Sequence, residues 1–174
     1  MSREKPKPTG RESFFDTEEI IVSKTDLKGR ITYANDVFLR VAHLTPQETI
    51  GAPHSIIRHP DMPRCVFKLL WERIQAGQEI FAYVLNMASN GDHYWVFAHV
   101  TPSRDANGTI VGYHSNRRKP DPAQIAAIEP VYRQLLAEER RHEDRKEGMT
   151  SGSSLLASVL KNKDLTYDEM VFAL

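Results

Sequence analysis

Two short runs rich in β-forming residues flank a turn near the start of the chain, and this pattern predicts a β-hairpin. The runs cover residues 19–24 and 30–34. The residues between them end in Gly29, and a glycine supplies the positive φ that a tight reversal requires. After residue 35 the apolar spacing becomes helical and predicts one short helix, while Thr45 and Glu48 predict the capped start of another.

A second region contains three strand-like runs and predicts three further strands. They are expected at residues 79–87, 93–102 and 109–116. Asn-Gly pairs at 90–91 and 107–108 connect them, and this pair is a strong hairpin signal, so the three strands should form a meander. The middle strand carries large apolar side chains at both odd and even positions, so both faces of the sheet must be covered.

Helical spacing of apolar residues predicts longer helices on either side of the meander. One is expected at 65–76, with Pro63 suited to its first position. Another begins with Asp121 as its N-cap. Pro130 interrupts the apolar stripe of this second helix, so we expect a kink or a break near Glu129.

The end of the chain changes in composition twice. Residues 138–147 are almost wholly charged, which indicates a solvated helix or a fraying helix end. Glycine and serine dominate 148–154, which predicts a flexible linker. The remaining residues to 174 form an amphipathic tail, in which Thr166 and Glu169 predict a capping box. Such a tail either docks on a partner or folds back onto its own domain.

These elements together predict an α+β fold. Two strands, several short helices and three more strands fit a five-stranded antiparallel sheet with short helices on one face. A further helix or the N-terminal arm would cover the other face. We expect an N-terminal arm or cap at 1–18, a folded domain at 19–119, a C-terminal helix at 120–147, and a linker with the amphipathic tail at 148–174.

Composition narrows the classes of partner and compartment. The 174 residues include 23 basic and 23 acidic side chains, so no net field recruits nucleic acid or an anionic membrane. A single cysteine, Cys65, excludes an internal disulfide and fits a reducing compartment. No apolar run is long enough to span a bilayer, and residues 1–10 do not resemble a secretory signal. We therefore expect a soluble, cytoplasmic protein.

Residues 58–63, Arg-His-Pro-Asp-Met-Pro, concentrate a cation, an imidazole and a carboxylate around two prolines. The prolines predict a stiff, extended connector. One interpretation is structural only: Asp61 caps the next helix and Arg58 pairs with Asp61. His59 and Asp61 also look like an acid–base pair, but no third group is evident to orient a nucleophile, so we do not expect an enzyme.

This hexapeptide and several other stretches resemble the PAS family, and within it the flavin-binding PAS domains of bacterial aerotaxis receptors. The matching stretches are residues 25–27, 31–36, 51–54, 58–63, 90–95 and 112–113. Together they cover about residues 20–118. The resemblance implies a PAS fold for the domain at 19–119. It also implies FAD held non-covalently between the sheet and the short helices, and a role in sensing redox state or oxygen rather than in turnover.

The resemblance further implies which residues hold the cofactor. Arg58, His59 and Asp61 match hexapeptide residues that retain the flavin. Asn86 matches a strand asparagine whose amide contacts the polar edge of the isoalloxazine ring. An amide offers both a donor and an acceptor, as that edge requires.

Other positions are implied in the same way. His54 stands where light-sensing LOV domains carry their reactive cysteine, so a photoadduct should not form. His114 aligns with a flavin-contacting glutamine of those domains, although a solvent-facing strand histidine is the alternative. Trp71 and Asn35 are further cofactor-binding candidates. Ile80 replaces a pocket tryptophan that the resemblance would lead one to expect.

The expected function is therefore a flavin sensor that signals to a chemoreceptor or other signalling protein in trans. A homodimer is expected, with no nucleic-acid binding and no membrane insertion. One alternative is a haem-binding PAS gas sensor, with His54 or His59 as ligand. The other is a ligand-free PAS module for dimerisation or docking.

Overall fold

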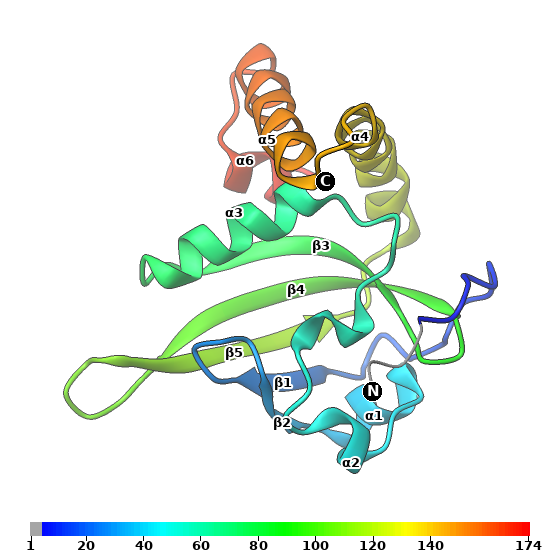
Figure 1. Cartoon of the computed structure of the whole chain (residues 1–174), viewed down its shortest axis with the longest axis vertical. Helices are drawn as coiled ribbons and strands as arrows, with labels where there is room; N and C mark the ends of the chain where they lie inside the picture. The colour runs from blue at the N-terminus through cyan, green and yellow to red at the C-terminus, as the bar shows by residue number, and fades with distance from the viewer. Residues whose placement is uncertain (1–4) are drawn as a thin grey trace.

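Five antiparallel strands form one sheet with helices packed against it (Figure 1). The computed structural model describes residues 5–174. The strands are β1 (Ile21–Thr25), β2 (Ile31–Ala34), β3 (Ile80–Met87), β4 (His93–Arg104) and β5 (Ile110–Arg118). Their order across the sheet is β2-β1-β5-β4-β3. The predicted α+β fold class is confirmed.

Both predicted groups of strands form as expected. β1 and β2 make the hairpin, and Gly29 in its turn has a φ of 76°. β3, β4 and β5 make the meander, with an unbroken β3–β4 register from the Ile80–Val100 pair to the Met87–His93 pair. The Asn-Gly turns succeed because Gly91 and Gly108 both adopt a positive φ, of 93° and 82°.

Short helices cover the inner face of the sheet. They are α1 (Asp36–Ala42), α2 (Pro46–Thr49), the 3₁₀ helix η1 (His54–Ile57) and α3 (Arg64–Gln75). The capping box at the start of α2 is present, because Thr45 accepts from the Glu48 N–H and the Glu48 side chain accepts from the Thr45 N–H. The prediction of short helices between the hairpin and the meander is confirmed.

The connector that contains η1 touches both edges of the sheet. At one end Pro53 forms a β-bridge with Arg30, just before the edge strand β2. At the other end Arg58 forms a β-bridge with Asn86 of the opposite edge strand, β3. The connector therefore crosses the inner face from edge to edge.

Three C-terminal helices cover the remaining apolar surface. They are α4 (Pro122–Arg140), α5 (Arg145–Asn162) and α6 (Tyr167–Phe172). On the outer face, Tyr132 of α4 stacks on Trp95 and donates a hydrogen bond to the Tyr83 carbonyl at 2.5 Å. Phe172 of α6 packs against Phe81, with ring centroids 4.9 Å apart. The expectation that both faces need cover is therefore met, and the tail folds back onto its own domain.

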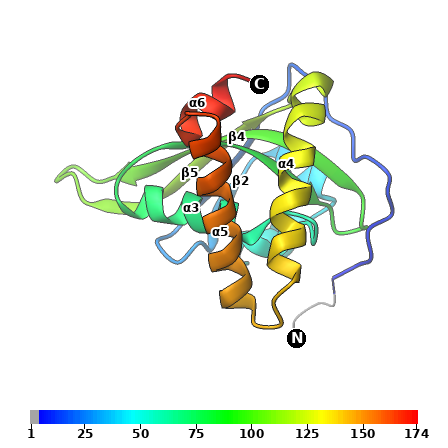
Figure 2. The same ribbon diagram turned by 90° about the horizontal axis from the view of Figure 1, so that it is seen from above.

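Pro130 does not break α4, which continues through it with Ile128 and Tyr132 buried on one side. Of the kink or break expected near Glu129, the break is therefore wrong, and so is the expected linker. Residues 148–154 are not a flexible linker but part of α5, which lies beside α4 (Figure 2). The glycines serve close packing here: a Cβ on Gly148 would lie 2.4 Å from the Glu139 carbonyl oxygen.

The charged stretch at 138–147 contains the turn between α4 and α5. Asp144 ends this turn and caps α5, accepting hydrogen bonds from the N–H groups of Lys146 and Glu147 at 2.9 and 2.8 Å. A single C-terminal helix over 120–147 is therefore wrong, because an N-cap at Asp144 starts a second helix.

The N-terminal arm lies along the start of β4. His93 donates its N–H to the Arg11 carbonyl and accepts from the Ser13 N–H, both at 2.8 Å. Phe15 is buried in the core. Residues 1–4 of the predicted arm lie outside the described residues. Within residues 5–174 no helix combines the length and apolarity needed to cross a membrane.

Candidate functional site

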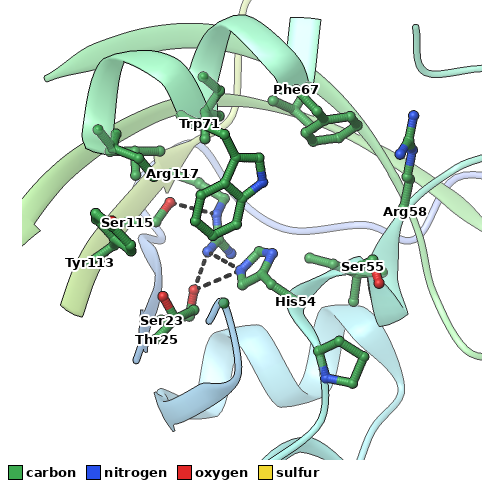
Figure 3. Close-up of a pocket in the computed structure, with 18 of the residues that line it drawn as sticks. Ser23, Thr25, His54, Ser55, Arg58, Phe67, Trp71, Tyr113, Ser115 and Arg117 are labelled. Carbon is green, nitrogen blue, oxygen red and sulfur yellow. Dashed lines mark hydrogen bonds between the residues drawn. The ribbon is translucent and has the colours of Figure 1, made fainter. Parts of the chain in front are cut away.

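A cavity of about 300 Å³ lies between the inner face of the sheet and the helices that cover it (Figure 3). Most of its wall is apolar: Phe67, Leu70, Trp71 and Ile74 from α3, and Val84, Ala98, Val100 and Tyr113 from the sheet. Small-molecule pockets begin at about this volume. Trp71 meets Tyr113 edge to face, with centroids 5.6 Å apart. The cavity therefore suits an apolar ring system.

Arg117 of β5 forms a polar end of this cavity. Its side chain is buried, with its Nε donating to Ser115 Oγ at 3.0 Å and its Nη2 donating to His54 Nε2 at 3.1 Å. Nη2 also donates to Ser23 Oγ. Nη1 is buried and has no hydrogen-bond acceptor within residues 5–174. A buried donor without an acceptor costs about 1–3 kcal/mol, so this end of the cavity is matched to an acceptor that a ligand would supply.

The Arg117 guanidinium is also a cation without a counterion in the described part of the chain. Burial lowers the pKa of Arg117 to about 10, which leaves it charged at neutral pH. Tyr94 is the side chain that raises this pKa. No Asp or Glu of residues 5–174 forms an ion pair with Arg117. The cavity thus holds a fixed positive charge in a poorly solvated place, where its field is strong.

His54 of η1 is held neutral next to this cation. Burial, and then the charge of Arg117, lower the pKa of His54 to about 3. Arginine only donates, so His54 Nε2 must accept and the ring hydrogen must sit on Nδ1. Ser23 Oγ lies 3.0 Å from the same Nε2. The three side chains form one network, in which Arg117 supplies the charge and His54 and Ser23 hold it in place.

Arg58 of the hexapeptide lies at the opposite end of the cavity (Figure 3). Its guanidinium lies over the Phe67 ring, 4.5 Å from the centroid. Burial, and then the charge of Arg64, lower its pKa. The expected pairing with Asp61 is wrong, because Asp61 pairs with Arg140 of α4 at 2.8 Å. Arg58 therefore stays available to a ligand.

Three more of the candidate residues border the cavity. Asn86 is buried, lines it, and makes no side-chain hydrogen bond within residues 5–174, so its amide can serve a ligand. Trp71 forms part of the wall. His114 also borders the cavity, but strand alternation with Tyr113 and Ser115 turns its side chain to the other face, toward Lys24. Burial, then Lys24, lower the pKa of His114.

His59 and Asn35 lie outside this first cavity, and their side chains form hydrogen bonds with backbone groups. His59 is buried, and its Nδ1 accepts from the Asp61 N–H at 3.0 Å. Burial lowers its pKa. Asn35 caps α1, accepting from the Phe38 N–H at 3.0 Å, and donates to the Ile20 carbonyl at 2.8 Å. Any effect of these side chains on a ligand in this first cavity is therefore indirect.

The prediction that Asp61 caps α3 is also wrong. Pro63 is the N-cap residue of α3 and makes no side-chain cap. Glu139 of α4 takes that role, accepting from the N–H groups of Arg64 and Cys65 at 2.9 and 2.8 Å. A carboxylate there accepts hydrogen bonds from two of the free N–H groups, and its negative charge interacts favourably with the helix dipole.

Sequence reasoning did not identify Arg117, Ser115 or Ser23 as site residues. A signal was present: Tyr113, Ser115 and Arg117 occupy alternate positions of β5 and so share one face. Two polar residues on the inward face of a strand indicate a lined cavity rather than a core.

The fold and this site define a class: a single-sheet α+β domain that encloses a small-molecule cavity between sheet and helices. Comparison with known families makes the class specific. The family model described as PAS fold matches residues 31–117, which is half of the chain. The chain belongs to the PAS family.

Similar proteins are sensors and regulators. The Escherichia coli (strain K12) aerotaxis receptor is 44% identical over 117 residues, which cover 67% of this chain and 23% of the receptor. The Klebsiella pneumoniae nitrogen fixation regulatory protein is 24% identical over 99 residues, covering 57% of this chain and 20% of that protein. The chain thus spans less than a quarter of the length of either relative. By name, these two relatives are a receptor and a regulatory protein.

Solved structures support the same fold. The light-state structure of the blue-light photoreceptor Aureochrome1 LOV domain superposes with a TM-score of 0.54 at 25% identity, covering 70% of this chain and 91% of that chain. A light-oxygen-voltage domain studied with a flavin analogue superposes with a TM-score of 0.57 at 19% identity, covering 64% of this chain and 83% of that chain. The second likeness shows the fold only.

Proposed function

We propose that this chain is a redox or oxygen sensor that binds FAD non-covalently in the cavity and signals to a separate protein. The observation that carries the proposal is the orphaned Nη1 of Arg117 at the polar end of an otherwise apolar cavity. An isoalloxazine ring system matches this distribution, because one end is a methyl-substituted benzene and the other a uracil-like edge with carbonyl acceptors. Asn86 lies toward the other end of the cavity, where its strand bridges Arg58, and would offer the ligand a further donor and acceptor there.

Bound flavin would supply electron-transfer chemistry that side chains lack. The charge of Arg117 would favour the form of the cofactor that carries additional negative charge, because the charge is fixed and poorly solvated. His54 would stay neutral and accept from Arg117 at Nε2. Reduction would then rearrange the hydrogen bonds of Arg117, Asn86 and His54.

The signal would leave through the elements that form the cavity wall. α3 carries four wall residues and is capped by Glu139 of α4, so a shift of α3 reaches the C-terminal helices. We propose a chemoreceptor or another signalling protein in the cytoplasm as recipient, and a homodimer as the working unit. The support is the similarity to an aerotaxis receptor, of which this chain covers only a part.

The haem alternative has weaker support. His54 Nε2 already accepts from Arg117, and His59 lies outside the cavity. The ligand-free alternative leaves Arg117 Nη1 without an acceptor. The bound ligand therefore explains more of the cavity than either alternative.

An absorption spectrum of the purified protein, in air and after reduction, tests the proposal. We expect flavin bands that bleach on reduction, either as purified or after reconstitution with FAD. A Soret band would replace the flavin proposal with haem. A colourless protein that takes up neither FAD, FMN nor riboflavin would overturn it.

A further inference from the structure

A second cavity, of about 650 Å³, lies on the other side of Arg58 from the first. It is bounded by the hexapeptide, the start of α3 and the turn between α4 and α5. We call it the basic groove and define it by six of its lining residues: Lys5, Arg58, Arg64, Glu139, Arg140 and Arg145.

The charge of the basic groove is unbalanced. Its defining residues comprise five cations and one carboxylate, in a chain whose total charge is zero. Both oxygens of that carboxylate, on Glu139, accept hydrogen bonds from the first turn of α3. Arg140 is paired with Asp61 outside the lining. The groove therefore presents a net positive field.

Three of the arginines lack an anionic partner in the described part of the chain. Arg58 contacts the Phe67 ring; the charge of Arg64 lowers its pKa, and the charge of Glu139 raises it to a smaller extent. Neither Arg64 nor Arg145 has a side-chain hydrogen bond or an ion pair within residues 5–174. Like charges gathered around one concave site repel each other, so an anion bound there would be stabilised by all of them.

Arg58 connects this groove to the first cavity, because its side chain lines both. A ligand with a ring in the first cavity and an anionic group near Arg58 would therefore reach both spaces. Arginines suit phosphate because their planar donors can bind it in a bidentate manner.

We propose that the basic groove binds a diphosphate group, and that the diphosphate belongs to the flavin dinucleotide whose ring occupies the first cavity. This inference rests on the proposed function. Arg58 and Arg64 of the sensor domain hold the diphosphate from one side, and Arg145 of α5 holds it from the other. The α4–α5 pair is thus part of the cofactor site, and FAD is selected over riboflavin.

The test compares ligands on the full chain. Kd values are measured for FAD, FMN and riboflavin with the wild type and with the Arg64→Gln, Arg145→Gln double variant. We expect the wild type to bind FAD more than about tenfold tighter than riboflavin. The double variant should weaken FAD binding by about tenfold and leave riboflavin binding unchanged, since riboflavin has no phosphate. Added salt should reduce the difference between the FAD and riboflavin affinities of the wild type, because it screens the arginine–phosphate attraction.

Arg133→Gln and Arg141→Gln are the matched control variants. Both remove an exposed arginine from α4 or the turn after it, outside the groove lining. They should leave all three affinities unchanged. Equal affinities of the wild type for FAD and riboflavin would overturn the proposal, as would an equal loss for both ligands in the double variant.

ADP and inorganic pyrophosphate test the diphosphate site independently of the proposed flavin binding. Calorimetry with each of them tests the groove without a flavin ring. Binding that the double variant weakens supports the diphosphate site even if no flavin binds, and the diphosphate would then come from a free nucleotide. Failure of ADP, pyrophosphate and FAD to bind overturns the site.

Discussion

Glu139 of α4 accepts a hydrogen bond from the N–H of Cys65 in α3, so a side chain of one helix caps the start of another that precedes it by 74 positions. The same carboxylate accepts from the Arg64 N–H. α3 provides a wall of the cavity, so Glu139 links the position of that wall to the C-terminal helices. Burial, reinforced by Glu139, also raises the pKa of Cys65 to about 12, so the thiol stays protonated.

Replacing Glu139 tests this link. Glu139→Ala leaves two N–H groups of α3 without a partner and should lower the free energy of unfolding by about 1–3 kcal/mol. Glu139→Gln keeps one acceptor oxygen and should cost less. Urea unfolding measures both. Glu143→Ala, at an exposed position of the following turn, should have no effect. Equal stabilities of the Ala variant and the wild type would contradict the capping role.

Gly152→Ala should destabilise the protein, against the usual preference of helices for alanine. Alanine normally stabilises an exposed helix interior by about 0.5–1 kcal/mol relative to glycine. In α5, however, a Cβ at Gly152 would lie 2.8 Å from Glu139 Cγ and 2.9 Å from Glu139 Oε1. We expect a loss of about 1–3 kcal/mol in thermal or urea unfolding. Ser158→Ala, on an exposed part of the same helix, is the control. A stabilised Gly152→Ala protein would show that α4 and α5 are not closely packed.

Arg117→Met should separate stability from binding. Removing a buried cation without a counterion should leave the flavin-free protein within about 1 kcal/mol of the wild type, or more stable. Flavin affinity should fall at least about tenfold, because a charged donor to the ligand is lost. Arg118→Met, at the exposed neighbouring position of β5, should change neither. Unchanged flavin affinity in Arg117→Met would remove Arg117 from the site.

His54 should make the protein acid-sensitive. Its pKa is lowered from 6.5 to about 3 in the folded state, so the unfolded state binds the proton more tightly. The stability that depends on neutral His54 is complete above pH 6.5 and is lost as the pH falls toward 3. The slope is about 1.4 kcal/mol for each pH unit, or roughly 2 kcal/mol by about pH 5.

His54→Gln should remove this contribution and flatten the acid side of the stability profile. Urea unfolding at a series of pH values measures it. His43→Asn is the control, because His43 is exposed and its positive φ is one that asparagine tolerates. An identical profile for His54→Gln and the wild type would mean that His54 does not titrate as its burial requires.

Local signals predicted the sheet well and the site only in part. Strand-like apolar runs and glycine-containing turns are properties of short segments, so all five strands could be located. Glu139 could not be identified as a cap, because its partners lie 74 and 75 positions away, and a charged run normally indicates a solvated surface. Gly148 and Gly152 were interpreted as a linker. In the structure they allow α4 to approach α5 closely, and that contact between distant segments leaves no local signal. His59 and Asp61 adjoin Arg58 in the chain but not in the cavity.

The connector from Pro53 to Arg58 also bears on how copies of this chain can associate. Exposed edge strands are templates for pairing with another chain and so promote aggregation. Here the connector pairs with the chain at Arg30 on the β2 side and at Asn86 of β3, which are the two open sides of the sheet. The connector, which also lines the cavity, therefore blocks edge-to-edge polymerisation at these two positions. Continuous pairing of a second copy across Arg30 or Asn86 would first have to detach the connector and open the binding site.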